Sequence, residues 1–148
     1  MSSRIRNFWI EAALLIALVV ATGAAIIVSL NQPLKSSDIE LAAADLRSFA
    51  AVGRLLADQR LTGNLTETFF DTQVSLLDEK VGATHKTLSD SAVEPKAEGD
   101  RQLAADVAKE VSAAIQQLKS LNGNEPEVIG RFDELATKAG RLEDRLKQ

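Results

Sequence analysis

Cysteine is absent from the 148 residues, which excludes disulfide frameworks, thiolate zinc sites, cysteine nucleophiles and covalently attached haem. Methionine and histidine occur once each, as Met1 and His85. A haem in a helical bundle needs axial histidine or methionine ligands. A di-iron bundle needs Glu-x-x-His pairs, but Gly82 stands three residues before His85. We therefore expect no metal and no cofactor, and we interpret His85 as a partly covered residue at the flank of a helix.

The chain also lacks a glycine-rich phosphate loop, a nucleophile elbow and any nucleic-acid-binding motif. Its net charge is −4. Leaving out Arg4, Arg6 and Glu11, the remaining residues include 15 basic and 20 acidic ones, a net charge of −5. An acidic surface disfavours nucleic acid and anionic lipid as partners. We therefore predict that the protein is not an enzyme, has no catalytic residues and does not bind nucleic acid.

One long apolar run is present near the N-terminus. Residues 8–30 read FWIEAALLIALVVATGAAIIVSL, with Glu11 as the only charge. A helix of this length spans about 34 Å, slightly more than the roughly 30 Å of a bilayer core. Trp9 lies at the start of the run, where an amphipathic ring suits the membrane interface. The run therefore predicts a single transmembrane helix.

The charges beside this run predict its orientation. Arg4 and Arg6 precede it, and positive residues favour the cytoplasmic side. We expect residues 1–7 to form a cytoplasmic tip, 8–30 the transmembrane helix, 31–36 a linker, and 37–148 an extracytoplasmic domain. The Ala-rich composition suggests a bacterial inner membrane, with the domain in the periplasm. A cleaved signal peptide is the alternative, although an apolar run this long favours an uncleaved anchor.

Small residues recur at every fourth position of the predicted transmembrane helix. They are Ala13, Ala17, Ala21, Ala25 and Ser29. Such a small-xxx-small series allows two helices to approach closely in lipid. It is a possible transmembrane packing face for a second copy of the chain or for another protein.

The remaining residues predict four amphipathic helices of about 22 to 26 residues. Apolar residues are spaced three and four apart, which is typical of helices with one buried face. We expect the first helix to begin after an N-cap at Ser37 and to end near Leu61, before Gly63. The second begins after Asn64, and the third begins at Pro95 or Asp100. The fourth helix begins near Pro126.

The expected core residues form one seam on each helix. The first two seams are Ile39, Ala42, Leu46, Phe49, Gly53 and Leu56, then Phe70, Val74, Leu77, Val81, Thr84 and Leu88. The last two are Ala104, Val107, Val111, Ala114, Leu118 and Leu121, then Ile129, Phe132, Leu135, Ala136, Ala139, Leu142 and Leu146. Short connections make neighbouring helices antiparallel, so the sequence predicts an all-α, up-down-up-down four-helix bundle. The alternative is a pair of helical hairpins that complete their cores in a dimer.

Arg47 and Arg54 lie seven residues apart, on one stripe of the first predicted helix. Two guanidinium groups on one stripe can hold a carboxylate or phosphate ligand. They can equally pair with acidic residues of a neighbouring helix. These two arginines are the candidate ligand contacts of the sequence.

The order of basic tip, span and long helix resembles the sensory modules of bacterial chemoreceptors and some sensor kinases. Stretches such as Leu46-Arg47-Ser48-Phe49 to Leu56-Ala57 add to this resemblance. It implies a four-helix bundle that senses a ligand outside the membrane. In that family the fourth helix leads into a second span, but no second apolar run follows Leu146 here. The resemblance therefore implies no two-span signalling, and no ligand residues carry over.

Two functions remain open at this stage. The first is a non-catalytic, membrane-anchored interaction module that serves as scaffold, adaptor or accessory subunit. Its partner would be another envelope protein or a second copy, giving a homodimer. The second is a ligand-sensing bundle that signals through a partner protein.

Overall fold

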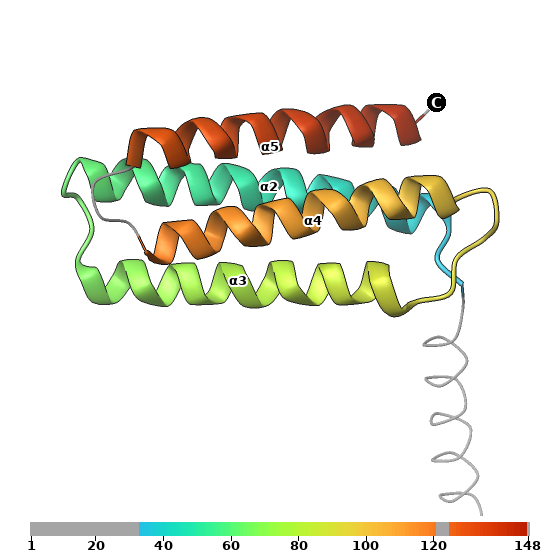
Figure 1. Cartoon of the computed structure of the whole chain (residues 1–148), viewed down its shortest axis with the longest axis horizontal. Helices are drawn as coiled ribbons and strands as arrows, with labels where there is room; N and C mark the ends of the chain where they lie inside the picture. The colour runs from blue at the N-terminus through green and yellow to red at the C-terminus, as the bar shows by residue number, and fades with distance from the viewer. Residues whose placement is uncertain (1–32, 121–124, 148) are drawn as a thin grey trace, which may run out of the picture. The chain divides into compact units, whose positions relative to one another are not determined.

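The computed structural model describes residues 33–120 and 125–147, and these residues are helical apart from short connections. The helices are α2 (Ser36–Leu61), α3 (Glu67–Asp90), α4 (Glu98–Lys119) and α5 (Glu125–Leu146) (Figure 1). Their lengths of 26, 24, 22 and 22 residues confirm the predicted range. The part of the chain that the structure describes contains no strand, only an isolated bridge between Leu34 and Val93. The all-α prediction is therefore confirmed.

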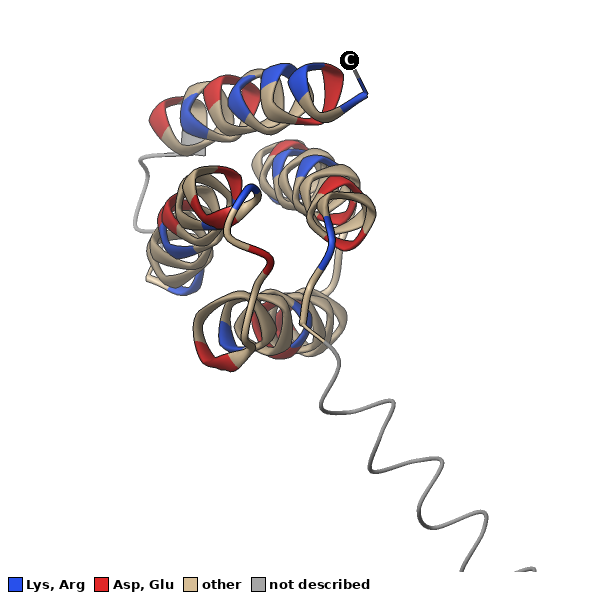
Figure 2. Ribbon diagram, turned by 90° about the vertical axis from the view of Figure 1, so that its right-hand side faces the viewer, with Lys and Arg blue, Asp and Glu red and all other residues tan. Residues whose placement is uncertain are grey.

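The helices form a four-helix bundle in which consecutive helices run antiparallel (Figure 1). Viewed along the helices, α5 and α3 lie opposite each other, with α2 and α4 on the two sides between them (Figure 2). α2 contacts all three other helices, whereas α3 and α5 do not contact each other. The most extensive helix pair is α2 with α5. The bundle therefore has a short diagonal from α2 to α4.

The core is entirely apolar within the described residues, where no polar or charged side chain is buried. Its largest fully buried side chains are Phe70, Phe132, Ile39, Leu46, Leu88, Ile115 and Leu118. Because one chain encloses these side chains, the core needs no second copy to complete it. The alternative of two hairpins that share a core in a dimer is therefore not needed to explain burial.

Small residues bring α2 and α5 together. α2 buries Ala43, Ala50, Gly53 and Ala57, and α5 buries Ala139. The expected seam of α2 placed Ala42 and Phe49 in the core, but both are only half-buried. Alanine is small enough to be accommodated on either the buried or the exposed side of a helix. Ala43, Ala50 and Ala57 are buried instead, and the larger Phe49 lies at the edge of the core.

Three predicted helix starts are wrong. α4 begins at Glu98 rather than at Pro95 or Asp100. The N-cap of α2 is Lys35 rather than Ser37, because the Asp38 carboxylate accepts a hydrogen bond from the Lys35 amide at 2.8 Å. The N-cap of α3 is Thr66 rather than Asn64, and its hydroxyl accepts from the Phe69 amide. In α2 the capping side chain belongs to the third residue after the boundary, and in α3 it belongs to the boundary residue itself. The end of α2 at Leu61 is as predicted, and Gly63 just beyond it has the left-handed conformation, with φ of 69°.

Backbone hydrogen bonds join Leu34, just before α2, to the connection between α3 and α4. The amide of Leu34 donates to the Ala92 carbonyl at 2.8 Å, and the amide of Glu94 donates to the Leu34 carbonyl at 3.1 Å. Nearby, the Arg101 guanidinium donates to the Leu88 carbonyl at 2.7 Å. Arg101 thereby supplies a positive charge at the end of α3, whose last turn has no basic residue of its own.

The predicted tip at 1–7, span at 8–30 and its packing face from Ala13 to Ser29 lie outside the described residues. The helices that the structure does describe include none whose length and apolar character would let it cross a membrane.

Candidate interaction surface

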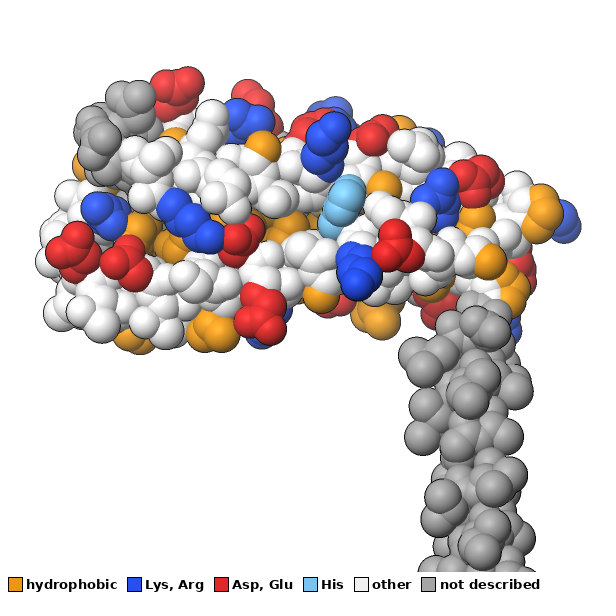
Figure 3. Space-filling view, turned by 60° about the horizontal axis from the view of Figure 1, so that its bottom comes forward, with side chains coloured by type: hydrophobic (Ala, Val, Ile, Leu, Met, Phe, Trp, Pro, Cys, Tyr) orange, Lys and Arg blue, Asp and Glu red, His pale blue; other side chains and the backbone are white. Residues whose placement is uncertain are grey.

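Exposed hydrophobic side chains are concentrated on two neighbouring helices. Among the described residues, the large hydrophobic side chains that stay exposed are Leu41, Val52, Leu55, Leu61, Phe69, Leu76 and Leu103. All but Leu103 belong to α2 and α3. The face on which α3 is turned toward the viewer shows hydrophobic side chains at the surface among the charged ones (Figure 3). By contrast, α5 carries charged residues along its whole length (Figure 2). The α2–α3 side is therefore the less polar side of the bundle.

Two of these leucines belong to a stripe on α2 that we call the α2 outer face. It consists of Leu41, Ala44, Ser48, Ala51 and Leu55. Leu41 is 64% exposed and Leu55 is 56% exposed. The spacing of three, four, three and four residues is that of the a and d positions of a coiled coil. None of the five side chains is charged.

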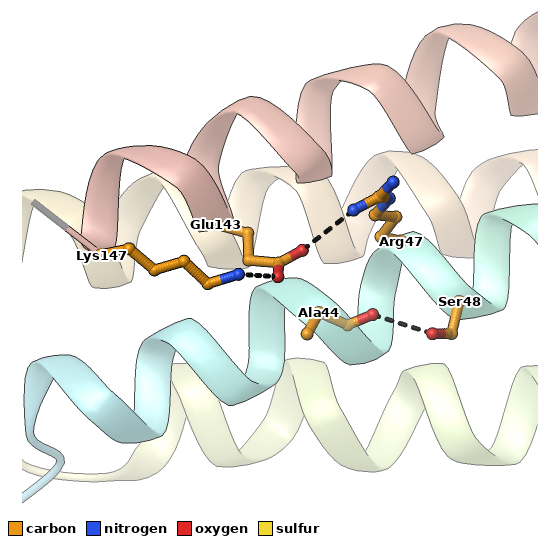
Figure 4. A network of polar contacts seen from close by, with 5 residues as sticks. All are labelled: Ala44, Arg47, Ser48, Glu143 and Lys147. Atoms are coloured by element: carbon orange, nitrogen blue, oxygen red, sulfur yellow. Dashed lines mark hydrogen bonds and ion pairs between the residues drawn. The ribbon is translucent and has the colours of Figure 1, made fainter.

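Ser48, at the centre of this face, has its hydroxyl engaged within the helix. Its Oγ donates a hydrogen bond to the Ala44 carbonyl at 3.0 Å (Figure 4). This is the back-bonding by which serine satisfies its hydroxyl inside a helix. The hydroxyl donor of Ser48 is therefore already satisfied within the helix. Covering the middle of the face would not leave this donor without an acceptor.

The predicted ligand contacts Arg47 and Arg54 lie at the flank of α2 that packs against α5. Arg47 forms an ion pair with Glu143 at 3.4 Å, and Arg54 forms one with Asp133 at 2.7 Å. Both arginine side chains are about half exposed. Lys147 also contacts the Glu143 carboxylate, at 2.5 Å (Figure 4). Each arginine thus has its own carboxylate partner on α5.

Glu143 is the most connected carboxylate of this flank. The hydrogen bond from Lys147, and secondarily that from Arg47, holds the pKa of Glu143 below its ordinary value. A carboxyl group whose pKa is lower in the folded than in the unfolded chain stabilises the fold above its unfolded pKa. That contribution is lost as the pH falls through the folded pKa.

We therefore expect Glu143→Gln to reduce the acid sensitivity of the bundle. The melting temperature of the variant should lie below that of the parent protein near neutral pH, and the difference should shrink as the pH falls from about 6 to about 2. Thermal melts followed by circular dichroism over this range measure the difference. Asp106→Asn on α4 is the matched control. A difference in melting temperature between Glu143→Gln and the parent protein that stays constant over this pH range would contradict the expectation.

A groove of about 360 Å³ continues the apolar surface from Leu41 toward α3. Its walls are formed by the start of α2 and the end of α3, and include Ala42, Ala83 and Leu88. Two carboxylates, Asp38 and Asp45, lie at the groove. A second groove, of about 540 Å³, lies beside Arg47 along α5 and is lined mainly by polar and charged side chains.

The part of the chain that the structure covers was expected to hold no metal site. No group of three or more His, Asp or Glu side chains there could hold a metal ion. His85 is half-buried on α3, as a flank residue is expected to be.

Sequence reasoning had not identified the α2 outer face. Leu41 and Leu55 lie off the predicted seam of α2. Their place off the seam was the feature of the sequence that could have indicated this face. An apolar residue opposite a well-formed seam is left exposed by the fold unless something else covers it.

No protein-family model matches the chain, and neither curated proteins nor solved structures give a match.

Proposed function

We propose that the chain is a non-catalytic, membrane-anchored interaction module. Residues 8–30 span a bacterial inner membrane, residues 1–7 remain in the cytoplasm, and the bundle stands in the periplasm. The bundle binds another envelope protein or a second copy of itself. The observation that supports this proposal best is the α2 outer face, on which Leu41 and Leu55 stay exposed and no side chain is charged. Isolated exposed hydrophobic residues are ordinary on a protein surface, whereas a contiguous apolar patch is typical of a contact site.

The apolar run supports the anchor. Inserting 23 residues with a single charge near one end is favourable in lipid, whereas exposing them to water is costly. The bundle itself buries its core within residues 34–148, which form one compact unit. Anchor and bundle can therefore be tested separately.

We expect the full chain to remain in the membrane fraction after carbonate extraction, and residues 34–148 alone to be released. The fragment should retain a helical circular dichroism spectrum and melt cooperatively, because its core is complete. Protease added to cells with a permeabilised outer membrane should digest the bundle. An extractable full chain, an unfolded fragment or a protected bundle would each contradict this part of the proposal.

The alternative function is ligand sensing through Arg47 and Arg54, with the signal passed to a partner protein. Each of these arginines is already paired with a carboxylate of α5. An anionic ligand would have to compete with Glu143 and Asp133 for the guanidinium groups. The structure therefore gives this alternative less support than the interaction module.

A further inference from the structure

We propose that the groove between the start of α2 and the end of α3 binds a linear aliphatic diamine, held at its two ends by Asp38 and Asp45. Such a ligand has two ammonium groups joined by a hydrocarbon chain. Binding in this groove would depend on neither the predicted membrane anchor nor a protein partner.

The α2 wall of the groove is acidic at both ends and apolar in the middle. Asp38 and Asp45 line the groove, and Leu41 and Ala42 lie between them along the helix. Positions seven residues apart lie on the same side of a helix, about 10 Å from each other along its axis. This pattern matches a ligand with a positive charge at each end and an apolar middle.

The two carboxylates of the groove lack a basic partner within the described residues. No basic residue is among those that line the groove, and neither aspartate forms an ion pair in the described part of the chain. One oxygen of Asp38 accepts a hydrogen bond from the Lys35 amide at 2.8 Å, which brings no full positive charge. By contrast, Asp78 and Asp133 each pair with a basic side chain. The charge of the groove therefore favours a cation and disfavours an anion.

The walls of the groove are already ordered. Leu88, on the α3 side, is buried in the core. Leu34 also lines the groove, and its amide and carbonyl are both engaged, with the Ala92 carbonyl at 2.8 Å and the Glu94 amide at 3.1 Å. A site with ordered walls loses little conformational entropy when a ligand binds. Its volume of about 360 Å³ is suited to a small molecule.

Other cationic occupants fit this arrangement less well. A metal ion needs its oxygen ligands at about 2.5 Å from one point, but the two aspartates are about two helical turns apart. A chain with a single ammonium group would leave one carboxylate unpaired. A stable protein contact covers roughly 800 Å² on each partner, which would extend well beyond this groove. A diamine alone matches both charged ends and the apolar middle.

Equilibrium dialysis of the full chain in non-ionic detergent micelles, with protein-free micelles as the blank, measures the binding of radiolabelled diamines. 1,8-Diaminooctane is long enough to reach both aspartates. 1,3-Diaminopropane has the same charge but is too short, and 8-aminooctanoate has a similar length but only one positive end. At low ionic strength we expect 1,8-diaminooctane to bind at least about threefold more tightly than either of the other two. Equal binding of 1,3-diaminopropane would overturn the proposal, because it would indicate a diffuse counterion, and so would no binding of 1,8-diaminooctane.

Substitutions at the two ends test the charges. Asp38→Asn and Asp45→Asn should each weaken the binding of 1,8-diaminooctane at least about threefold. Asp58→Asn is the matched control, because Asp58 is an exposed aspartate of the same helix outside the groove, and it should leave binding unchanged. A similar loss in all three variants would indicate attraction to the overall acidic charge and would overturn the site. A loss confined to one of the two groove aspartates would equally overturn binding at both ends.

Leu41→Ala tests the apolar middle. It shortens an exposed side chain, so the bundle should stay folded, and it should weaken the binding of 1,8-diaminooctane but not that of 1,3-diaminopropane. Leu55→Ala shortens a similarly exposed leucine of the same helix outside the groove and should change neither. Circular dichroism melts confirm that each variant is folded. Unchanged binding of 1,8-diaminooctane to folded Leu41→Ala would mean that the hydrocarbon chain does not lie in the groove, and would overturn the proposal.

Discussion

Replacing Phe132 with alanine is expected to lower the free energy of unfolding by about 3–5 kcal/mol. Phe132 lies on α5 and is fully buried, and its ring contacts the backbone of α2 at Gly53. Truncation removes a large apolar side chain from the most extensive helix pair of the bundle. The backbone of α2 cannot collapse far into the space, because Ala50 and Ala57 on the same side are already packed in the core.

Urea denaturation of residues 34–148 measures this loss. Phe69→Ala is the matched control, because Phe69 is the same residue type but half exposed on α3. We expect the control to change the free energy of unfolding by less than about 1 kcal/mol. Similar losses for the two variants would mean that Phe132 does not lie in the core as described.

The seams of the helices could largely be predicted from the sequence. On α3 the prediction of buried residues holds for Phe70, Val74, Leu77 and Val81. Large apolar residues spaced three and four apart all lie on one face of a helix, so only that face can be the buried one. On α2, alanine occurs on several sides of the helix. Which alanines are buried depends on the position of α5, which the local pattern does not encode.

The partners of Arg47 and Arg54 could not be predicted for a related reason. Arg47 pairs with a residue 96 positions away in the sequence. Many acidic residues on neighbouring helices were possible partners, and only the register between α2 and α5 selects Glu143 and Asp133. The α2 outer face, by contrast, was visible in the sequence as the leucines Leu41 and Leu55 off the seam, and the described residues leave both of them exposed.

The close approach of α5 to α2 at Phe132 needs a glycine at position 53, and this gives the second large expected effect. A Cβ atom added at Gly53 would lie 2.5 Å from Cε1 and 2.6 Å from Cζ of Phe132. Because Phe132 is fully buried, its ring cannot move into solvent. We expect Gly53→Ala to lower the free energy of unfolding by about 1–3 kcal/mol through overpacking, despite the higher helix propensity of alanine.

Gly82→Ala is the control with the opposite expected sign. A Cβ added at Gly82, in the interior of α3, would meet nothing within 4 Å. Alanine there should raise the free energy of unfolding by about 0.5–1 kcal/mol, because it removes only the conformational freedom of glycine. Urea denaturation of both variants in residues 34–148 compares the two signs directly.

A double variant shows whether the cost at Gly53 comes from the Phe132 ring. Leucine at position 132 is smaller than phenylalanine and leaves room for the new methyl group. The loss caused by Gly53→Ala should therefore be smaller in the Phe132→Leu background than in the parent, a coupling that a double-mutant cycle measures. Additive losses of unfolding free energy would mean that the new methyl group clashes with a part of the core other than the Phe132 ring. In that case the contact between Gly53 and Phe132 would not be what sets how closely α2 and α5 approach.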